Sequence, residues 1–320
     1  MPAGNFCFNQ ILKSSPIMVI LFFIHFINPF MKKSIFDVNL KTIGMVNVDL
    51  ESIEAINSEA YKSYIKVLYL NGGFEIKVDF NVYHTTSPTL FFISPNQVLS
   101  IEKLGEQSGR LVFYNRDFYC IQLHDEEVAC DGLLFNNINN MPMTVIPQQD
   151  ATFIEYLFSR IEDEFELKDG SLEEMIRTYL KQLLIKSTRL WKVQHLDGAM
   201  AARPNNDLEF FRKFTQLVEA NFKEKHNVAD YADLLVIAPK TLTHRFKRLK
   251  VPQPNEIIKN RIILEAKRLL IHTDRTAKEI AYSLGYDDPA YFSRLFFIKT
   301  GEPPSGFRSK YLSTHEPKQI

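Results

Sequence analysis

The sequence is poor in cysteine and glycine, and it carries no excess of charge of either sign. Three cysteines among 320 residues, Cys7, Cys120 and Cys130, form no CxxC pair and are too few for a disulfide framework. They indicate free thiols in a reducing compartment, so we expect a cytoplasmic protein. Twelve glycines exclude a collagen-like repeat, and 45% hydrophobic residues exclude a disordered chain. A chain of this length predicts two folded domains.

The signatures of common enzymes are also missing. The sequence contains no GxxxxGK[ST], HExxH, GxSxG or GxGxxG motif. A metal-dependent barrel would need clustered His and Glu, but His84 and His124 are isolated, and Gln97 stands where a ligand His is expected. We therefore expect no catalytic residues, no metal site and no cofactor.

Charge is divided unevenly between the two halves of the chain. Residues 203–320 contain 21 Lys and Arg against 14 Asp and Glu, whereas residues 1–202 contain 17 against 24. A basic C-terminal part beside an acidic N-terminal part indicates a polyanion-binding module with a partner domain. The alternative is a chance fluctuation in composition.

An apolar run lies near the start of the chain, from Pro16 to Phe30. Fifteen residues rise only about 22 Å as a helix, less than the roughly 30 Å of a bilayer core, and one His and one Asn inside the run would be costly there. We interpret residues 1–30 as an extension upstream of a start at Met31. A membrane anchor is the alternative, and Lys32 after the run would then keep the rest of the chain cytoplasmic.

Residues 61 to about 135 have the pattern of β-strands. From Phe74 to Val82 apolar residues alternate with polar ones, which is the period of a half-buried strand. Another strand is predicted at Ile65–Leu70. The sequence Asn71-Gly72-Gly73 between the two strands predicts a hairpin, because a positive φ costs Asn and Gly little free energy. Further apolar runs predict strands at Leu90–Ile93, Val98–Ile101, Leu111–Tyr114 and Phe118–Leu123. So many short strands indicate a small barrel or sandwich.

The pattern changes to helical spacing after residue 150. Apolar residues at a period of about 3.6 predict helices at Phe153–Phe165 and Leu172–Trp191. The apolar stripe of the second helix is longer than a small barrel would cover, so we expect Leu172–Trp191 to mediate a homodimer. Residues 197–206 contain Gly, Pro and two Asn and predict a linker. Everything after Asp207 is expected to be helical.

Two segments of the C-terminal part repeat one plan. In residues 228–249, a small Ala232 is followed by a turn at Val236 and by an apolar Leu242, which is the spacing of a helix-turn-helix. Residues 276–299 repeat the plan at an offset of 49 residues before the turn and 50 after it, and such a duplication is more specific than one motif. Between them, residues 254–271 predict a helix about 27 Å long, which would hold two recognition helices about one DNA turn apart.

The residues around the second segment resemble a known family. They are EAKRLL at 265–270, IA at 280–281, LGY at 284–286, YFSR at 291–294 with Phe296, TGEPP at 300–304 and FR at 307–308. Together they look like the C-terminal signature of the AraC/XylS transcription regulators, over about residues 208–310. The N-terminal β region resembles that family's cupin-like sensor domain in outline, and the helices at 153–191 lie where such proteins often dimerise.

The resemblance implies an α+β protein, in which an N-terminal cupin-like β-barrel followed by helices is linked to an all-α domain with two helix-turn-helix motifs. A sensor and dimerisation domain would occupy residues 31–196, a linker 197–206, and an AraC-type DNA-binding domain 207–320. The implied function is a sequence-specific transcription activator that binds double-stranded DNA in successive major grooves, with RNA polymerase as a partner and a small-molecule effector at the N-terminal domain. The alternative is an enzyme or ligand carrier built on the β domain, with the helical domain as an accessory.

The outward positions of the two recognition helices predict the residues that contact DNA. Inward-facing Leu242 and Phe246 leave one stripe of the first helix outside, and the family's positions give the equivalent stripe of the second. We expect base contacts from Lys240, Thr243, His244, Ala290, Ser293 and Arg294, with Arg294 bidentate to guanine. We expect phosphate contacts from Lys247, Arg248 and Lys299. Solvated surface charge is the alternative for each.

Three positions depart from the family pattern. Ala238 stands where the first recognition helix usually begins with Ser, so its N-cap hydrogen bond is missing, a loss of about 1 kcal/mol. Asp288 supplies a cap for the second helix. Phe297 stands at a position that is usually basic, and Lys250 stands where a Gly normally follows the first motif.

Aromatic residues of the β region are candidates for the lining of a small-molecule pocket. They are Tyr83, Phe91, Phe92, Phe113 and Phe118. Aromatic side chains at strand spacing more often form plain core, which is the alternative.

Overall fold

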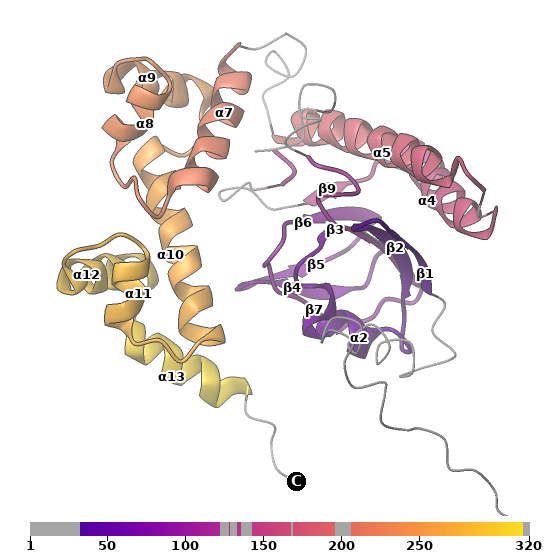
Figure 1. Cartoon of the computed structure of the whole chain (residues 1–320), viewed down its shortest axis with the longest axis horizontal. Coiled ribbons are helices and arrows are strands. Elements are labelled where there is room, and N and C mark those ends of the chain that lie inside the picture. The colour runs from indigo at the N-terminus through magenta and orange to yellow at the C-terminus, as the bar shows by residue number, and fades with distance from the viewer. Residues whose placement is uncertain are drawn as a thin grey trace, which may run out of the picture.

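The computed structural model describes residues 33–121, 128, 133–135, 143–167, 169–195 and 206–315. Within this part of the chain, a β domain with two long helices precedes an all-helical domain (Figure 1). This order of elements confirms the predicted fold class. No helix among the described residues is long and apolar enough to cross a membrane. The apolar run before Met31 and residues 197–205 of the predicted linker lie outside the described part.

The β domain contains two antiparallel sheets. The larger has the strand order β1-β2-β8-β3-β6-β9, and the smaller has the order β5-β4-β7. A short helix, α2 (Ile53–Asn57), and a 3₁₀ helix, η1 (Glu59–Tyr61), lie between β2 and β3. The strands are β1 (Lys33–Val38), β2 (Lys41–Val48), β3 (Ile65–Leu70), β4 (Glu75–Val78), β5 (Asn81–His84), β6 (Thr89–Ile93), β7 (Leu99–Lys103), β8 (Gly109–Tyr114) and β9 (Met143–Val145).

The six-stranded sheet is covered on both faces. In β3, Val67 and Tyr69 pack with helices α4 (Gln148–Leu167) and α5 (Leu172–His195), whereas Leu68 and Leu70 pack with the smaller sheet. Because successive side chains of a strand point to opposite faces, β3 is buried along its whole length. The domain therefore has three layers: the helix pair, the larger sheet and the smaller sheet.

The predicted strand from Phe74 to Val82 is wrong in its second half. The chain turns at Asp79, whose φ of 54° is left-handed, and returns as β5 in a hairpin with β4. Val82 is half exposed and Tyr83 is buried, which reverses the predicted alternation. The reason is tertiary, because Phe80 at the tip of the hairpin packs against the last helix of the other domain.

Two other β predictions are corrected by the pairing of the strands. Asn71-Gly72-Gly73 is not a hairpin turn, since β3 pairs with β6 and β8 while β4 pairs with β5 and β7. The turn instead carries the chain from one sheet to the other. The described part of the run that starts at Phe118 is not a strand either, because Asn115 Oδ1 accepts hydrogen bonds from the N–H groups of Phe118 and Thr42 and so holds a turn there.

Strands β1 and β2 were not among the predicted strands. Most of β2 is buried on both faces, so it shows no alternation of polar and apolar residues. The turn that joins it to β1 consists of Asn39 and Leu40, both with positive φ, and a Leu in that position is an unusual signal for a hairpin.

Helices α4 and α5 lie side by side on the larger sheet (Figure 1). The apolar stripe of Leu172–Trp191 faces the interior of the chain, where Leu180 and Leu183 are fully buried. The exposed apolar side chains of the helix pair lie elsewhere, at Phe153, Tyr156, Leu167, Met175 and Val193. A homodimer through α5 therefore stays a prediction, and its interface would have to use this outward face.

The helical domain contains two helix-turn-helix motifs joined by one long helix. The bounds of these helices agree with the two predicted motifs and with the helix predicted at 254–271. A Pro at the start of α9, α10 and α12 fits because the first residue of a helix needs no N–H donor. The helices are α7 (Asn206–Asn221), α8 (Val228–Leu234), α9 (Pro239–Leu249), α10 (Pro254–His272), α11 (Ala277–Ser283), α12 (Pro289–Thr300) and α13 (Pro304–His315).

The two motifs share a backbone shape that is built from different residues. Val236 and Gly285 occupy equivalent left-handed positions, with φ of 55° and 77°. At the ends of the recognition helices, Lys250 and Gly301 have φ of 55° and 78°. A left-handed backbone costs a residue with a Cβ about 1–2 kcal/mol. The first motif therefore holds strain at two positions where Gly avoids it in the second.

We expect Val236→Gly to stabilise the first motif by about 1 kcal/mol, because the Val side chain is 89% exposed and loses no packing. Amide hydrogen exchange in α8 and α9 should slow about fivefold. Val236→Ala is the matched control: it keeps a Cβ and should recover little of the gain. Equal protection in the two variants would show that backbone strain is not the cause.

Candidate nucleic-acid interface

The first motif presents a cationic stripe. Helix α8 contributes a fully buried Ala232, and α9 crosses it with Leu242, Phe246 and Leu249 facing inward. The opposite side of α9 is exposed, as predicted from its helical spacing. Its exposed residues include Lys240, Thr243, His244, Lys247 and Arg248.

The recognition helix of the second motif has a stronger cap than that of the first. In α11, Thr276 and Glu279 form a reciprocal capping box, and in α12 the Asp288 side chain accepts a hydrogen bond of 2.8 Å from the Ala290 N–H. Ala238, at the equivalent position of the first motif, makes no side-chain cap. On α12 the Arg294 side chain is 69% exposed, and its contact to Asp288, at 3.9 Å, leaves it able to swing toward a partner.

One pair of hydroxyl groups has the same geometry in both helices. Thr243 Oγ1 donates to the Pro239 carbonyl at 3.1 Å, and Ser293 Oγ donates to the Pro289 carbonyl at 2.8 Å. With their hydrogens used in this way, both oxygens offer lone pairs to a ligand. Acceptors at these positions suit the amino groups of adenine or cytosine in a major groove.

The three predicted phosphate contacts lie in different places. Lys247 and Arg248 are exposed at the end of α9. Lys299 lies on the opposite side of its helix from Arg294, and its side chain, which is 18% exposed, pairs with Glu256 of α10. The structure thus separates Lys299 from the outward stripe of α12.

The two motifs are joined by more than the connecting helix. The ring of His226, in the loop before α8, stacks on Tyr286 of the second turn at 4.3 Å between centroids. Gly285 lies so close to Lys223 that a Cβ would come within 2.0 Å of its carbonyl oxygen. In Figure 1, α9 and α12 lie on the side of α10 away from the β domain. These contacts and α10 together fix the two recognition helices relative to each other.

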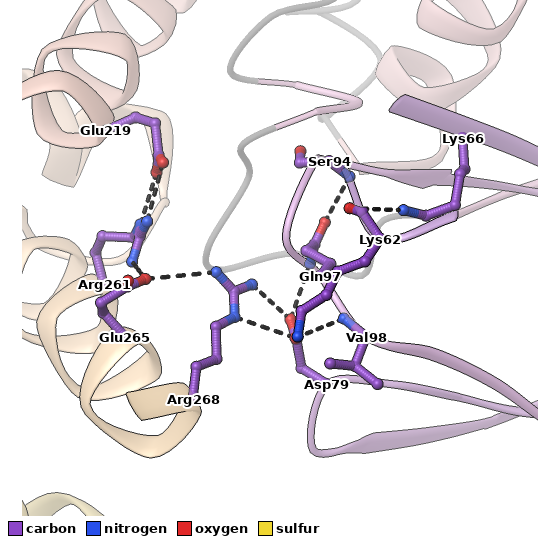
Figure 2. A network of polar contacts seen from close by, with 10 residues as sticks. All are labelled: Lys62, Lys66, Asp79, Ser94, Gln97, Val98, Glu219, Arg261, Glu265 and Arg268. Carbon is purple, nitrogen blue, oxygen red and sulfur yellow. Dashed lines mark hydrogen bonds and ion pairs between the residues drawn. The ribbon is translucent and has the colours of Figure 1, made fainter. Parts of the chain in front are cut away.

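A network of alternating charges runs along α10 (Figure 2). Arg261 is nearly buried and makes a bidentate pair with Glu219 of α7, at 2.6 and 2.9 Å. Its other side contacts Glu265 at 3.0 Å, and Glu265 lies 3.6 Å from Arg268. The guanidinium of Arg261 also lies 3.8 Å above the ring of Phe222.

The network ends in a contact between the two domains. Arg268 donates to both carboxylate oxygens of Asp79, at 3.1 and 2.7 Å. Gln97 and the Val98 N–H donate to the same carboxylate from the β domain, at 3.0 and 3.2 Å. The Asp79 side chain is 4% exposed, so this is a buried ion pair with all its acceptor sites occupied.

Apolar contacts lie beside this ion pair. Phe80 packs edge-on against Phe307 and Tyr311 of α13, with centroids 5.7 and 6.1 Å apart. Lys267 lies 5.3 Å above the ring of Phe80, and burial lowers the pKa of its ammonium. The hairpin of β4 and β5 therefore touches both α10 and α13.

A buried lysine supports the loop beside Asp79. Lys66 of β3 is 1% exposed, and its ammonium donates to the carbonyls of Tyr61 and Tyr64 at 2.8 and 2.9 Å. Burial lowers the pKa of Lys66 to about 7. The sequence gives no sign of this role, because Lys66 contacts backbone carbonyls, which every residue type carries.

A cavity of about 330 Å³ lies between α10 and the β domain. Tyr83 and Phe92, two of the five predicted pocket aromatics, line it together with Arg261, Lys267 and Arg268. Phe91 and Phe113 are instead buried between the two sheets, and Phe118 is buried under the helix pair. The five aromatics thus do not gather around one pocket, and the cavity wall includes cationic side chains of the helical domain that the sequence did not associate with it.

These features define a helix-turn-helix protein, and comparison with known proteins agrees. Residues 231–310 match a family model described as a helix-turn-helix domain. The chain is 32% identical over 102 residues to the bifunctional transcriptional activator/DNA repair enzyme AdaA of Bacillus subtilis, covering 32% of this chain and 48% of that protein. It is 23% identical over 180 residues to histidine kinase P4 of Formosa agariphila, covering 54% of this chain and 13% of that protein. The chain thus spans less than half the length of either relative.

Among solved structures, the chain is similar to ToxT of Vibrio cholerae with an unsaturated fatty acid bound. The identity is 15%, the match covers 85% of this chain and 96% of that one, and the TM-score is 0.39. The family match and the curated relatives confirm the resemblance noted in the sequence: the C-terminal region of this chain is an AraC-type helix-turn-helix domain.

We expect Gly285→Ala to separate the two motifs, because the new Cβ would overlap the Lys223 carbonyl. Gly301→Ala is the matched control, since φ is 78° there and a Cβ would meet nothing within 4 Å. Backbone strain alone should cost Gly301→Ala about 1 kcal/mol, and the added overlap should bring Gly285→Ala to about 3 kcal/mol. Denaturant unfolding of both variants measures the difference. Equal losses would mean that the Lys223 contact does not restrain the second motif.

Proposed function

We propose that the protein is a sequence-specific DNA-binding transcription regulator. The observation that carries this proposal is the pair of motifs held by α10, whose outward stripes are exposed on the side away from the β domain. The match of residues 231–310 to a helix-turn-helix family and the activator named among the relatives support it. Such a pair of motifs suits successive major grooves on one face of DNA.

Within this function the outward residues have distinct roles. Lys240 and His244 donate to guanine acceptors, and Thr243 and Ser293 accept from base amino groups. Arg294 makes a bidentate contact with guanine, and Ala290 lets the start of α12 approach the base edges. Lys247 and Arg248 bind phosphates, which set the position on DNA without reading sequence. Lys299 would join them only after its pair with Glu256 opens.

Arg294→Ala and Lys247→Ala should weaken DNA binding in different ways. Loss of a bidentate base contact should relax the preference at one base pair by about 1–3 kcal/mol, whereas loss of a phosphate contact should weaken all sequences alike and lower the salt slope by about one counterion. Binding isotherms on an operator and on a single-base variant, at two salt concentrations, separate the two. If Arg294→Ala weakens binding to both DNAs equally, Arg294 contacts a phosphate and not a base.

The β domain is proposed to act as the sensor. The cavity beside α10 is the site that best suits a small-molecule effector, because it adjoins the ion pair between Asp79 and Arg268. An occupant there would contact the helix that carries both motifs. The recognition stripes remain exposed in this docked arrangement, so control through α10 would act on the placement of the motifs and not by covering them.

Asp79→Ala should loosen the contact between the domains. It removes the acceptor of Arg268, Gln97 and Val98, and breaking a buried ion pair costs about 3 kcal/mol. Hydrogen exchange of the full chain should accelerate in α13. Glu302→Ala, which breaks the exposed pair with Lys310, is the control and should leave α13 unchanged at its contact with Phe80. If Asp79→Ala leaves α13 as protected as before, the ion pair does not hold the domains together.

The location, the partners and the oligomeric state of the protein are also proposed. We propose that it acts in the cytoplasm as an activator that contacts RNA polymerase, without catalytic residues of its own. A homodimer would use the outward face of α4 and α5, where Phe153 and Tyr156 are exposed. The activator named among the relatives supports the sign of regulation.

A further inference from the structure

The internal duplication allows α12 to be compared with α9 position by position. At an offset of 50 residues, Thr243 corresponds to Ser293 and His244 to Arg294, so the centre of each stripe keeps its polar character. The cationic positions around that centre do not. Lys240, Lys247 and Arg248 of α9 correspond to Ala290, Phe297 and Ile298 of α12.

The apolar replacements are exposed. Phe297 is 53% exposed and Ile298 is 77% exposed, whereas the neighbouring Phe296 is fully buried in the core of the domain. Packing within the described part of the chain therefore does not account for an aromatic side chain at position 297. A large exposed apolar side chain on a recognition helix points to contact with a partner.

The position of Phe297 identifies that partner. Ala290, Ser293, Arg294 and Phe297 lie at i, i+3, i+4 and i+7 of α12, on the face that a recognition helix turns toward a major groove. Phe297 corresponds to Lys247 of α9, which is proposed to reach a phosphate at the edge of the groove. Phe297 is therefore continuous with the stripe that is proposed to read DNA, one turn beyond Ser293. A phenyl ring binds neither a phosphate nor a hydrogen-bonding base edge. The 5-methyl group of thymine is the apolar group of the major groove.

We propose that α12 reads thymine methyl groups through Phe297, with Ala290 allowing close approach, so that the second motif recognises a thymine-containing half-site. The inference rests on the proposed DNA-binding function and specifies the class of DNA sequence. The two motifs would then have different roles in DNA binding. Helix α9 supplies most of the charge for phosphate binding, and α12 supplies base contacts that depend little on salt.

The test uses the full chain and DNA sites enriched from a random pool. Each thymine of an enriched site is replaced singly by deoxyuridine, which lacks only the methyl group. We expect at least one replacement to weaken binding about fourfold, the loss for one buried methyl-sized group. In Phe297→Ala that sensitivity should disappear, and in Phe297→Leu, which keeps an apolar side chain, it should remain in part. Tyr282→Ala removes an exposed aromatic ring from α11 and is the matched control, which should keep the wild-type sensitivity.

A charged variant gives an independent reading. Phe297→Lys should abolish the sensitivity to deoxyuridine and raise the salt slope by about one counterion, because it restores the charge found at Lys247. The inference is overturned if wild type and Phe297→Ala respond alike to every deoxyuridine. It is also overturned if Phe297→Ala binds DNA as wild type does but loses activation, since the ring would then contact a protein. Failure of the wild type to enrich any sequence would instead overturn the proposed function.

Discussion

The arrangement of the helical domain depends on the charges along α10. Glu219, Arg261, Glu265, Arg268 and Asp79 alternate in sign and are largely withdrawn from water, so each needs the neighbours that the fold gives it. Desolvated ions tolerate little displacement, because a lost partner leaves a charge unpaired in a medium of low dielectric constant. The network therefore ties α7, α10 and the tip of the β4–β5 hairpin into one arrangement. Helix α10 in turn connects the two motifs.

The two motifs repeat one pattern of residues but differ in backbone strain, in the cap of the recognition helix and in charge. The first accepts left-handed Val236 and Lys250 and lacks an N-cap at Ala238, whereas the second has Gly285 and Gly301 at the equivalent places. The first motif also carries most of the outward cations. In the proposed function, the first motif would supply most of the charged contact with the DNA backbone and the second would supply apolar contact with base edges.

One turn of the β domain makes two kinds of contact with the helical domain. Asp79 and Phe80 provide an ion pair and an aromatic contact from one two-residue turn. An effector that bound beside this contact could change how the domains are placed by contributing a few kcal/mol of differential binding. The cavity adjoins this contact and is lined from both domains, so an occupant would bind the docked arrangement in preference to a separated one.

The sequence by itself determined the helical domain, its duplication and the outward stripes, because helix periodicity, caps and turn residues act over less than ten residues. Its short apolar runs also predicted a β region of many short strands, whereas the three layers became apparent only in the structure. Only the tertiary structure decided where the chain turns at Asp79, which sheets the turn at Asn71 connects, and that Lys299 pairs with Glu256. Asp79 and Arg268 are 189 residues apart, and no local pattern encodes a contact at that separation. The residues that couple the domains could therefore be identified only from the tertiary structure.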